Sequence, residues 1–257
     1  MLALELDHPP YVFESMGTVV SLRTNDPLSV AATTAVVSAC EALDDRFSLY
    51  RPGSEGDLVA RRLLRVRHAS SSYRVAYDLA LGWRDRTEGA FTPHRPDGAI
   101  DLSGVVKALA IQAAADALHR HGVRGWCLNA GGDVLVDGEQ PDGQPWVVGV
   151  VDPDDRTALW TQYLALTKPA VATSGTAERG EHVWRLAADD TFSQVTVAAD
   201  DIITADVWAT AILAGGVSTL ELAQRTDEVD VLACTADGRV WASPVFLRPS
   251  PPSPSDQ

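Results

Sequence analysis

The strongest constraint on the fold is a change of pattern near Gly122. Before this glycine, capping residues and apolar spacing predict helices over residues 29–47, 72–87 and 103–121, with Ser29 and Ser103 as N-caps. After it, short apolar runs separated by glycines predict strands, namely two within residues 125–136 around a Gly-Gly pair, then residues 146–151, 171–175 and 194–198, and a hairpin over 229–242. Helices mixed with hairpins indicate an α+β fold with a largely antiparallel sheet flanked by helices.

Three further segments complete the predicted organisation. Residues 11–23 are expected to be extended and broken at Met16-Gly17-Thr18, residues 48–57 to form a loop, and residues 204–214 to form a short helix that ends at Gly215-Gly216. We expect one domain over residues 1–248. The Pro/Ser-rich stretch 249–257 is expected to be a disordered tail.

The charge balance argues against two kinds of partner. The 257 residues include 21 Lys+Arg and 35 Asp+Glu, a formal net charge of -14, which repels nucleic acid and anionic membranes. A small anionic ligand remains compatible, because a metal ion or a helix terminus can reverse the charge locally. With no apolar run of about 18–20 residues, no signal-peptide pattern and no cysteine near the N-terminus, we expect a cytoplasmic protein without a membrane anchor.

A carboxylate and a hydroxyl lie one turn apart on the helix predicted over residues 204–214. Asp206 and Thr210 are at i and i+4, which places their Cβ atoms about 5–6 Å apart. Their oxygens are the hard ligands that Mg²⁺ prefers. Asp206 can equally be a first-turn carboxylate stabilised by the helix dipole, and the pair taken alone favours that interpretation.

A second candidate site lies where residues 101–107, Asp-Leu-Ser-Gly-Val-Val-Lys, enter a helix. Free backbone N–H groups at a helix start can hold a phosphate, Gly104 permits close approach, and Lys107 adds a positive charge. The alternative is an ordinary helix start with a surface lysine.

Three further segments are candidates for a ligand site. They are Asn-Ala-Gly-Gly-Asp at 129–133, Ala-Thr-Ser-Gly at 172–175 followed by His182, and the Gly-Ala-Phe-Thr-Pro loop at 89–93. His182 titrates near neutrality and could accept a proton from a hydroxyl, although a lone histidine is more often structural. Phe91 could pack on an aromatic ligand or equally fill the core, and the glycine pair could be a plain hairpin turn.

The order of these motifs closely resembles that of the ApbE family, the FAD:protein FMN transferases. The resemblance runs from about Met16 to Gly216 through Met16-Gly-Thr, Ser48-Leu-Tyr50, Ser54-Glu55, Gly89-Ala-Phe91, Asp101 to Lys107, Asn129 to Asp133, Ala172 to Gly175 with Glu178-Arg179, Ala205-Asp206 and Ala209-Thr210-Ala211. It implies an ApbE-like α+β fold with a flavin-nucleotide cleft. It also implies Mg²⁺-dependent transfer of FMN from FAD to a Thr or Ser hydroxyl of an acceptor protein, with release of AMP.

The resemblance also implies roles for particular residues. Asp206, Thr210 and the Gly104 carbonyl match the metal ligands, and His182 is the candidate general base beside Asp206 in the catalytic set. The positions that match FAD contacts are Met16, Tyr50, Ala90, Phe91, Thr92, Asp101, Lys107 and Val183.

The chain departs from the family pattern at several positions. Thr92 replaces the usual Asp, Ala108 the usual Gly and Gln112 a common Asp, and the Asp-Pro and Thr-Gly that usually follow the histidine are missing after His182. Two other functions therefore stay open: a non-catalytic FAD-binding protein, and an FAD pyrophosphatase that forms FMN and AMP.

Overall fold

The protein is described by a computed structural model that covers residues 8–153, 155, 157–165, 168–175 and 192–247. Its main feature is an eight-stranded sheet in the order β1-β2-β3-β4-β7-β8-β9-β10, in which every neighbouring pair is antiparallel. The strands are β1 Tyr11–Ser15, β2 Thr18–Thr24, β3 Trp126–Ala130, β4 Asp133–Asp137, β7 Ala170–Gly175, β8 Phe192–Ala199, β9 Asp230–Thr235 and β10 Val240–Ala242.

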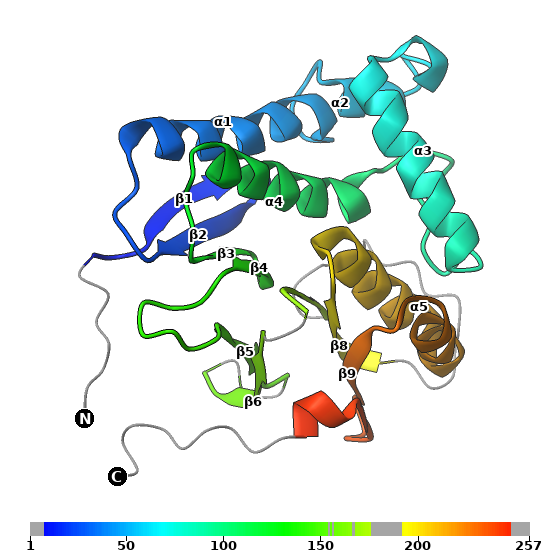
Figure 1. The fold of residues 1–257 in the computed structure, drawn as a ribbon. Helices are drawn as coiled ribbons and strands as arrows, with labels where there is room; N and C mark the ends of the chain where they lie inside the picture. Colours follow the sequence, from blue (N-terminus) through cyan, green and yellow to red (C-terminus); the bar gives the residue numbers. More distant parts are fainter. Residues whose placement is uncertain (1–7, 154, 156, 166–167, 176–191, 248–257) are drawn as a thin grey trace.

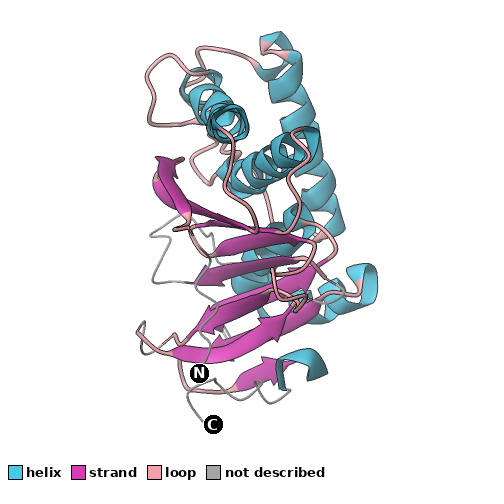
Figure 2. Ribbon diagram, turned by 60° about the vertical axis from the view of Figure 1, so that its left-hand side comes forward, coloured by secondary structure: helices cyan, strands magenta, loops and turns pink. Residues whose placement is uncertain are grey.

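Helices lie along one side of this sheet, as Figure 2 shows. They are α1 Val30–Phe47, α2 Glu55–Ala60, α3 Ser71–Arg86, α4 Ser103–Arg120 and α5 Ile202–Asp227, with short 3₁₀ turns η1 Val66–His68 and η3 Pro244–Leu247. A separate two-stranded hairpin joins β5 Val147–Val151 to β6 Leu159–Leu164. The predicted α+β class with a largely antiparallel sheet is confirmed.

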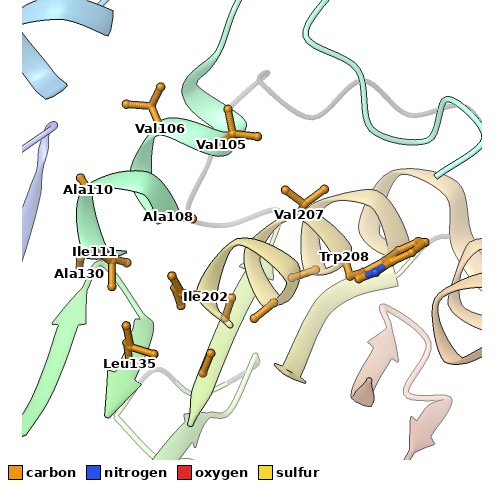
Figure 3. Close-up of a cluster of buried hydrophobic side chains, with 14 of the residues drawn as sticks. Val105, Val106, Ala108, Ala110, Ile111, Ala130, Leu135, Ile202, Val207 and Trp208 are labelled. Atoms are coloured by element: carbon orange, nitrogen blue, oxygen red, sulfur yellow. The ribbon is translucent and has the colours of Figure 1, made fainter. Parts of the chain in front are cut away.

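The main core lies between the sheet and the helices. Figure 3 shows Val105 of α4 and Val207 of α5 facing each other, while the Trp208 ring points away from α4. Trp208 is fully buried and meets Trp83 of α3 edge to face, with ring centroids 6.0 Å apart. A smaller apolar cluster, on side chains such as Val134, is built with the β5–β6 hairpin. Alternation along the strands therefore supplies both clusters.

Helix starts follow the expected capping chemistry at α1 but not at α4. The Ser29 hydroxyl accepts a hydrogen bond from the Ala32 N–H at 3.1 Å, as predicted. At α4 the N-cap position is Leu102, and the Ser103 prediction is wrong. The reason is Asp101, whose carboxylate accepts both the Ser103 N–H at 2.9 Å and the Ser103 hydroxyl at 2.6 Å.

The helix break expected at the Gly-Gly pair is confirmed, because Gly216 departs from helical geometry, with φ 70° and ψ −153°. The sequence pattern does not predict the second helical stretch, which follows directly and extends α5 to Asp227. Figure 1 shows the change of direction that results. The residues beyond the break, including Leu220 and Ala223, are buried, so their packing stabilises the continued helix. The sequence pattern does not predict two short elements, α2 and β6.

α5 is also apolar enough to raise the question of a membrane span. Among the described residues, it is the one helix whose length and composition would allow it to cross a membrane. Two thirds of its most apolar window, 67%, is buried inside the fold, which is common for a core helix.

The cysteines behave as apolar side chains. None of the three forms a disulfide, and Cys40 and Cys234 are buried. Burial raises the pKa of the Cys40 and Cys127 thiols to about 11, so both stay protonated at neutral pH.

The backbone of Gly216 predicts a stability effect. Its φ/ψ pair is essentially restricted to glycine, so Gly216→Ala should lower the free energy of unfolding by about 1–3 kcal/mol. Gly82 is the matched control, because it lies in α3 with open space where an alanine Cβ would stand, and Gly82→Ala should raise stability by about 0.5–1 kcal/mol. Urea titrations of both variants measure the two effects. If the two variants were equally stable, the Gly216 backbone would not require glycine.

Candidate functional site

Three charged side chains from distant parts of the chain meet at the centre of the candidate site. Lys107 of α4 forms an ion pair with Asp133, the first residue of β4, and its Nζ lies 3.8 Å from Oδ1 of Asp206 in α5. Both carboxylates are fully buried, while the Lys107 side chain is 15% exposed. Two carboxylates and one ammonium leave a formal charge of −1, an environment that favours a further cation.

A tight turn places Asp133 at this centre. Gly131 and Gly132 both have positive φ, and the Asn129 side chain accepts the Gly132 N–H at 3.0 Å. The Asp133 carboxylate also accepts the Thr173 N–H of β7 at 3.2 Å. The glycine pair is thus a hairpin turn that also aims a carboxylate inward.

Hydroxyl groups lie beside the carboxylates. Thr210 follows Asp206 by one helical turn, and its Oγ1 lies 3.2 Å from the Oγ of buried Ser174 in β7. A second pair, Thr173 and Thr196, lies 2.9 Å apart on β7 and β8. The structure thus adds Ser174 to the carboxylate–hydroxyl pair predicted on α5.

The donor atoms suit a magnesium ion that is completed by its substrate. Asp206 and Thr210 offer hard oxygens, and Mg²⁺ usually takes one or two carboxylates together with phosphate oxygens and water. The described residues contain no group of three or more His, Cys, Asp or Glu side chains that could hold a metal alone. A cation here would therefore complete its coordination with other oxygens, such as those of water, backbone carbonyls or a bound phosphate.

The loop before α4 packs tightly against the start of that helix. Phe91 is 5% exposed, and its ring covers Gly104 so closely that a Cβ there would lie 2.7 Å from Cε2. Phe91 could pack on an aromatic ligand or fill the core, and in the structure it fills the core. Ala90 lies close to Gly215 of α5, and the Thr92 hydroxyl accepts the His94 N–H at 3.2 Å.

The turn between β1 and β2 lies next to the β3–β4 turn. A Cβ on Gly131 would lie 2.5 Å from the Thr18 hydroxyl, and the Gly131 N–H donates to the Val19 carbonyl. Met16 occupies this turn with φ 52°. It lines a cavity of about 420 Å³ that also involves Asp44 and Arg51.

The remaining predicted site residues are Tyr50, on an exposed loop, and the pair at 182–183. Tyr50 is 79% exposed on the loop before Arg51, whose guanidinium pairs with Asp44 and Asp45 at 2.6 Å each. His182 and Val183 lie outside the described residues, so their roles stay predictions.

The structure gives Asp133 and Ser174 more weight than the sequence does. The sequence pattern indicates Asp133 only as a possible turn carboxylate, and Ser174 only as a small residue near a ligand. What distinguishes them is burial: both polar side chains occupy buried strand positions, and a single sequence does not show burial.

Solved structures define the class of this fold. The chain is similar to the flavin transferase ApbE from Vibrio cholerae, with a TM-score of 0.74 at 21% identity over 93% of this chain and 98% of that one. It is also similar to the apo form of the Pseudomonas stutzeri flavinyl transferase ApbE, with a TM-score of 0.74 at 17% identity over 93% and 96% of the two chains. The fold is therefore that of the ApbE proteins.

Sequence comparison then identifies the family. The ApbE family profile matches residues 92–233, more than half of the chain, and the chain belongs to the ApbE family. The FAD:protein FMN transferases of Salmonella typhimurium and Escherichia coli are each 25% identical over 166 residues. These alignments cover 59% of this chain and 47% of each relative, so the chain spans about half the length of the curated relatives it matches.

The contact between Lys107 and Asp133 predicts a stability difference between two Asp→Asn variants. Asp133→Asn should lower the free energy of unfolding by about 1–3 kcal/mol, because a charged hydrogen-bond partner is removed from a buried site. Asp137→Asn, on the same strand but half-buried and 3.5 Å from His119, should change it by no more than about 0.5 kcal/mol. Urea denaturation compares them, and an unchanged midpoint for Asp133→Asn would count against the contact.

Proposed function

We propose that the protein is a Mg²⁺-dependent flavin transferase, which moves FMN from FAD to a Thr or Ser hydroxyl of an acceptor protein and releases AMP. The observation that carries the proposal is the meeting of Lys107, Asp133 and Asp206 beside Thr210 in a chain of the ApbE family. The curated relatives are named for this activity.

The proposed roles follow from the placement of the residues. Asp206 and Thr210, with the Gly104 carbonyl, would hold the cation beside the pyrophosphate of FAD. Bound there, Mg²⁺ would neutralise charge on the phosphoryl oxygens and on the leaving AMP. Lys107, held by Asp133 at the same place, would contribute a fixed positive charge to a phosphate.

The proposed reaction is a substitution at phosphorus. The acceptor oxygen forms a bond to the phosphorus of the FMN half, the bond from that phosphorus to the bridging oxygen breaks, and AMP leaves with the bridging oxygen. The acceptor hydroxyl gives its proton to His182, our candidate base, whose neutral imidazole can accept it.

We propose that the other residues matched to FAD contacts lie around the substrate. Met16 and Tyr50, on neighbouring loops, are proposed to contact FAD together with Ala90, Thr92, Asp101 and Val183. Phe91 is buried on Gly104, so we propose that it supports the FAD site from behind through packing.

Flavin transfer can be measured on an acceptor protein by intact mass. With FAD and Mg²⁺, the acceptor mass should rise by one FMN group, and chelation of Mg²⁺ should stop the rise. Asp206→Asn should slow transfer about 100-fold or more while FAD still binds. Asp78→Asn, an exposed change on α3, is the control and should transfer normally.

The same assay separates the two other functions. FMN and AMP released without acceptor would indicate a pyrophosphatase. Intact FAD retained with every divalent metal tested would indicate a binding protein and would overturn the proposal.

The base assignment predicts a second kinetic effect. His182→Ala should keep binding of FAD and of metal but slow transfer by about 10²–10⁴-fold, since a general base typically contributes that much. Flavin fluorescence titration reports the binding and intact mass reports the transfer. Transfer at the parental rate would show that another group takes the proton.

A further inference from the structure

The segment from the end of α2 to the first turn of α3 is strongly basic in an acidic protein. Residues 61–74 contain five arginines and no Asp or Glu, while the rest of the chain carries 16 Lys+Arg against 35 Asp+Glu. We call the surface made by these arginines the arginine surface; its members are Arg61, Arg62, Arg65, Arg67 and Arg74. All five are exposed.

Little of this charge is neutralised within the protein. In the part of the chain that the structure describes, Arg61 alone among the five pairs with a carboxylate, that of Asp57 at 3.5 Å. Arg62 donates to the Asp97 carbonyl at 2.9 Å, and Arg67 donates to the His68 ring at 3.1 Å. These contacts orient the guanidinium groups without cancelling their charge.

The backbone under the arginine surface is well fixed. The N–H groups of Leu63 and Leu64 both donate to the Leu58 carbonyl, at 2.8 and 3.0 Å. The Glu55 carboxylate accepts both the N–H and the hydroxyl of Ser70 at 2.5 Å, which ties α2 to the start of α3. The charges are thus presented on a pre-formed surface, which lowers the entropy lost on binding.

We propose that the arginine surface binds an acidic segment of a partner protein. The members are all arginine, and the planar guanidinium matches a carboxylate with two parallel hydrogen bonds. The inference goes beyond flavin transfer and does not depend on it. Arg62 contacts the carbonyl of Asp97, in the loop that leads to Asp101 and α4, so a partner bound here would lie next to that loop.

The overall charge distribution favours a short acidic segment over an extended anionic surface. Charges farther apart than about 8 Å are largely screened at physiological ionic strength, so a short peptide senses mainly the local arginines. A membrane or a duplex would also face the acidic remainder of the molecule, with 35 acidic against 16 basic residues. Membrane binding also needs apolar side chains that enter the lipid. Within residues 61–74, Leu63 is the one large hydrophobic side chain that is exposed.

A direct binding experiment tests the proposal. A labelled oligoglutamate peptide should bind the full chain, with an affinity that falls as salt is added. An oligoglutamine peptide of the same length should not bind. Arg65→Glu/Arg67→Glu should weaken oligoglutamate binding at least about tenfold. The control Arg124→Glu/Arg225→Glu changes the net charge equally at exposed positions elsewhere and should bind as the parent does.

The other outcomes overturn the proposal. They are absence of oligoglutamate binding, equal weakening by the two double variants, and binding to phosphatidylserine vesicles without binding to oligoglutamate. Circular dichroism checks folding. If the charge reversal unfolds the chain, Arg65→Gln/Arg67→Gln replaces it and should still lose affinity.

Discussion

The contact of Lys107 with two buried carboxylates is the interaction on which the candidate site depends. Burying charged groups costs several kcal/mol each unless they are paired, so α4, β4 and α5 are constrained to the arrangement that keeps the ammonium beside Asp133 and Asp206. The apolar packing between α4 and α5, where Val105 faces Val207, supports the same arrangement. Packing and charge thus specify a single geometry.

That geometry gives the site its chemical character. Three side chains with a formal charge of −1 lie next to the hydroxyls of Thr210 and Ser174, which suits a small hard cation accompanied by phosphate oxygens. In the proposed function, the strongly acidic chain would bind its anionic substrate through the positive charge of Lys107 and through a cation. The arginine surface follows the same rule, with local charge opposite to that of the whole molecule.

Much of the fold follows from local patterns. The strand breaks predicted at Met16-Gly17 and at Gly131-Gly132 are confirmed, since the backbone has positive φ there and the flanking strands pair antiparallel. Glycine tolerates positive φ, so its position in the sequence is enough to indicate such a turn. The helix break predicted at the Gly-Gly pair is confirmed as well, since Gly216 has positive φ. The helical stretch after the break is not predicted, because it depends on burial of Leu220 and Ala223, and a single sequence does not show burial.

The sequence by itself determined the fold class, the family and the one-turn spacing of Asp206 and Thr210, because periodicity, turn residues and motif order are all local or linear properties. Only the tertiary structure decided that Asp133 is a buried partner of Lys107, that Ser174 lies beside Thr210, and that Phe91 fills the core over Gly104. Those facts depend on strands and helices that are far apart in the chain and meet only when the sheet and α5 pack together.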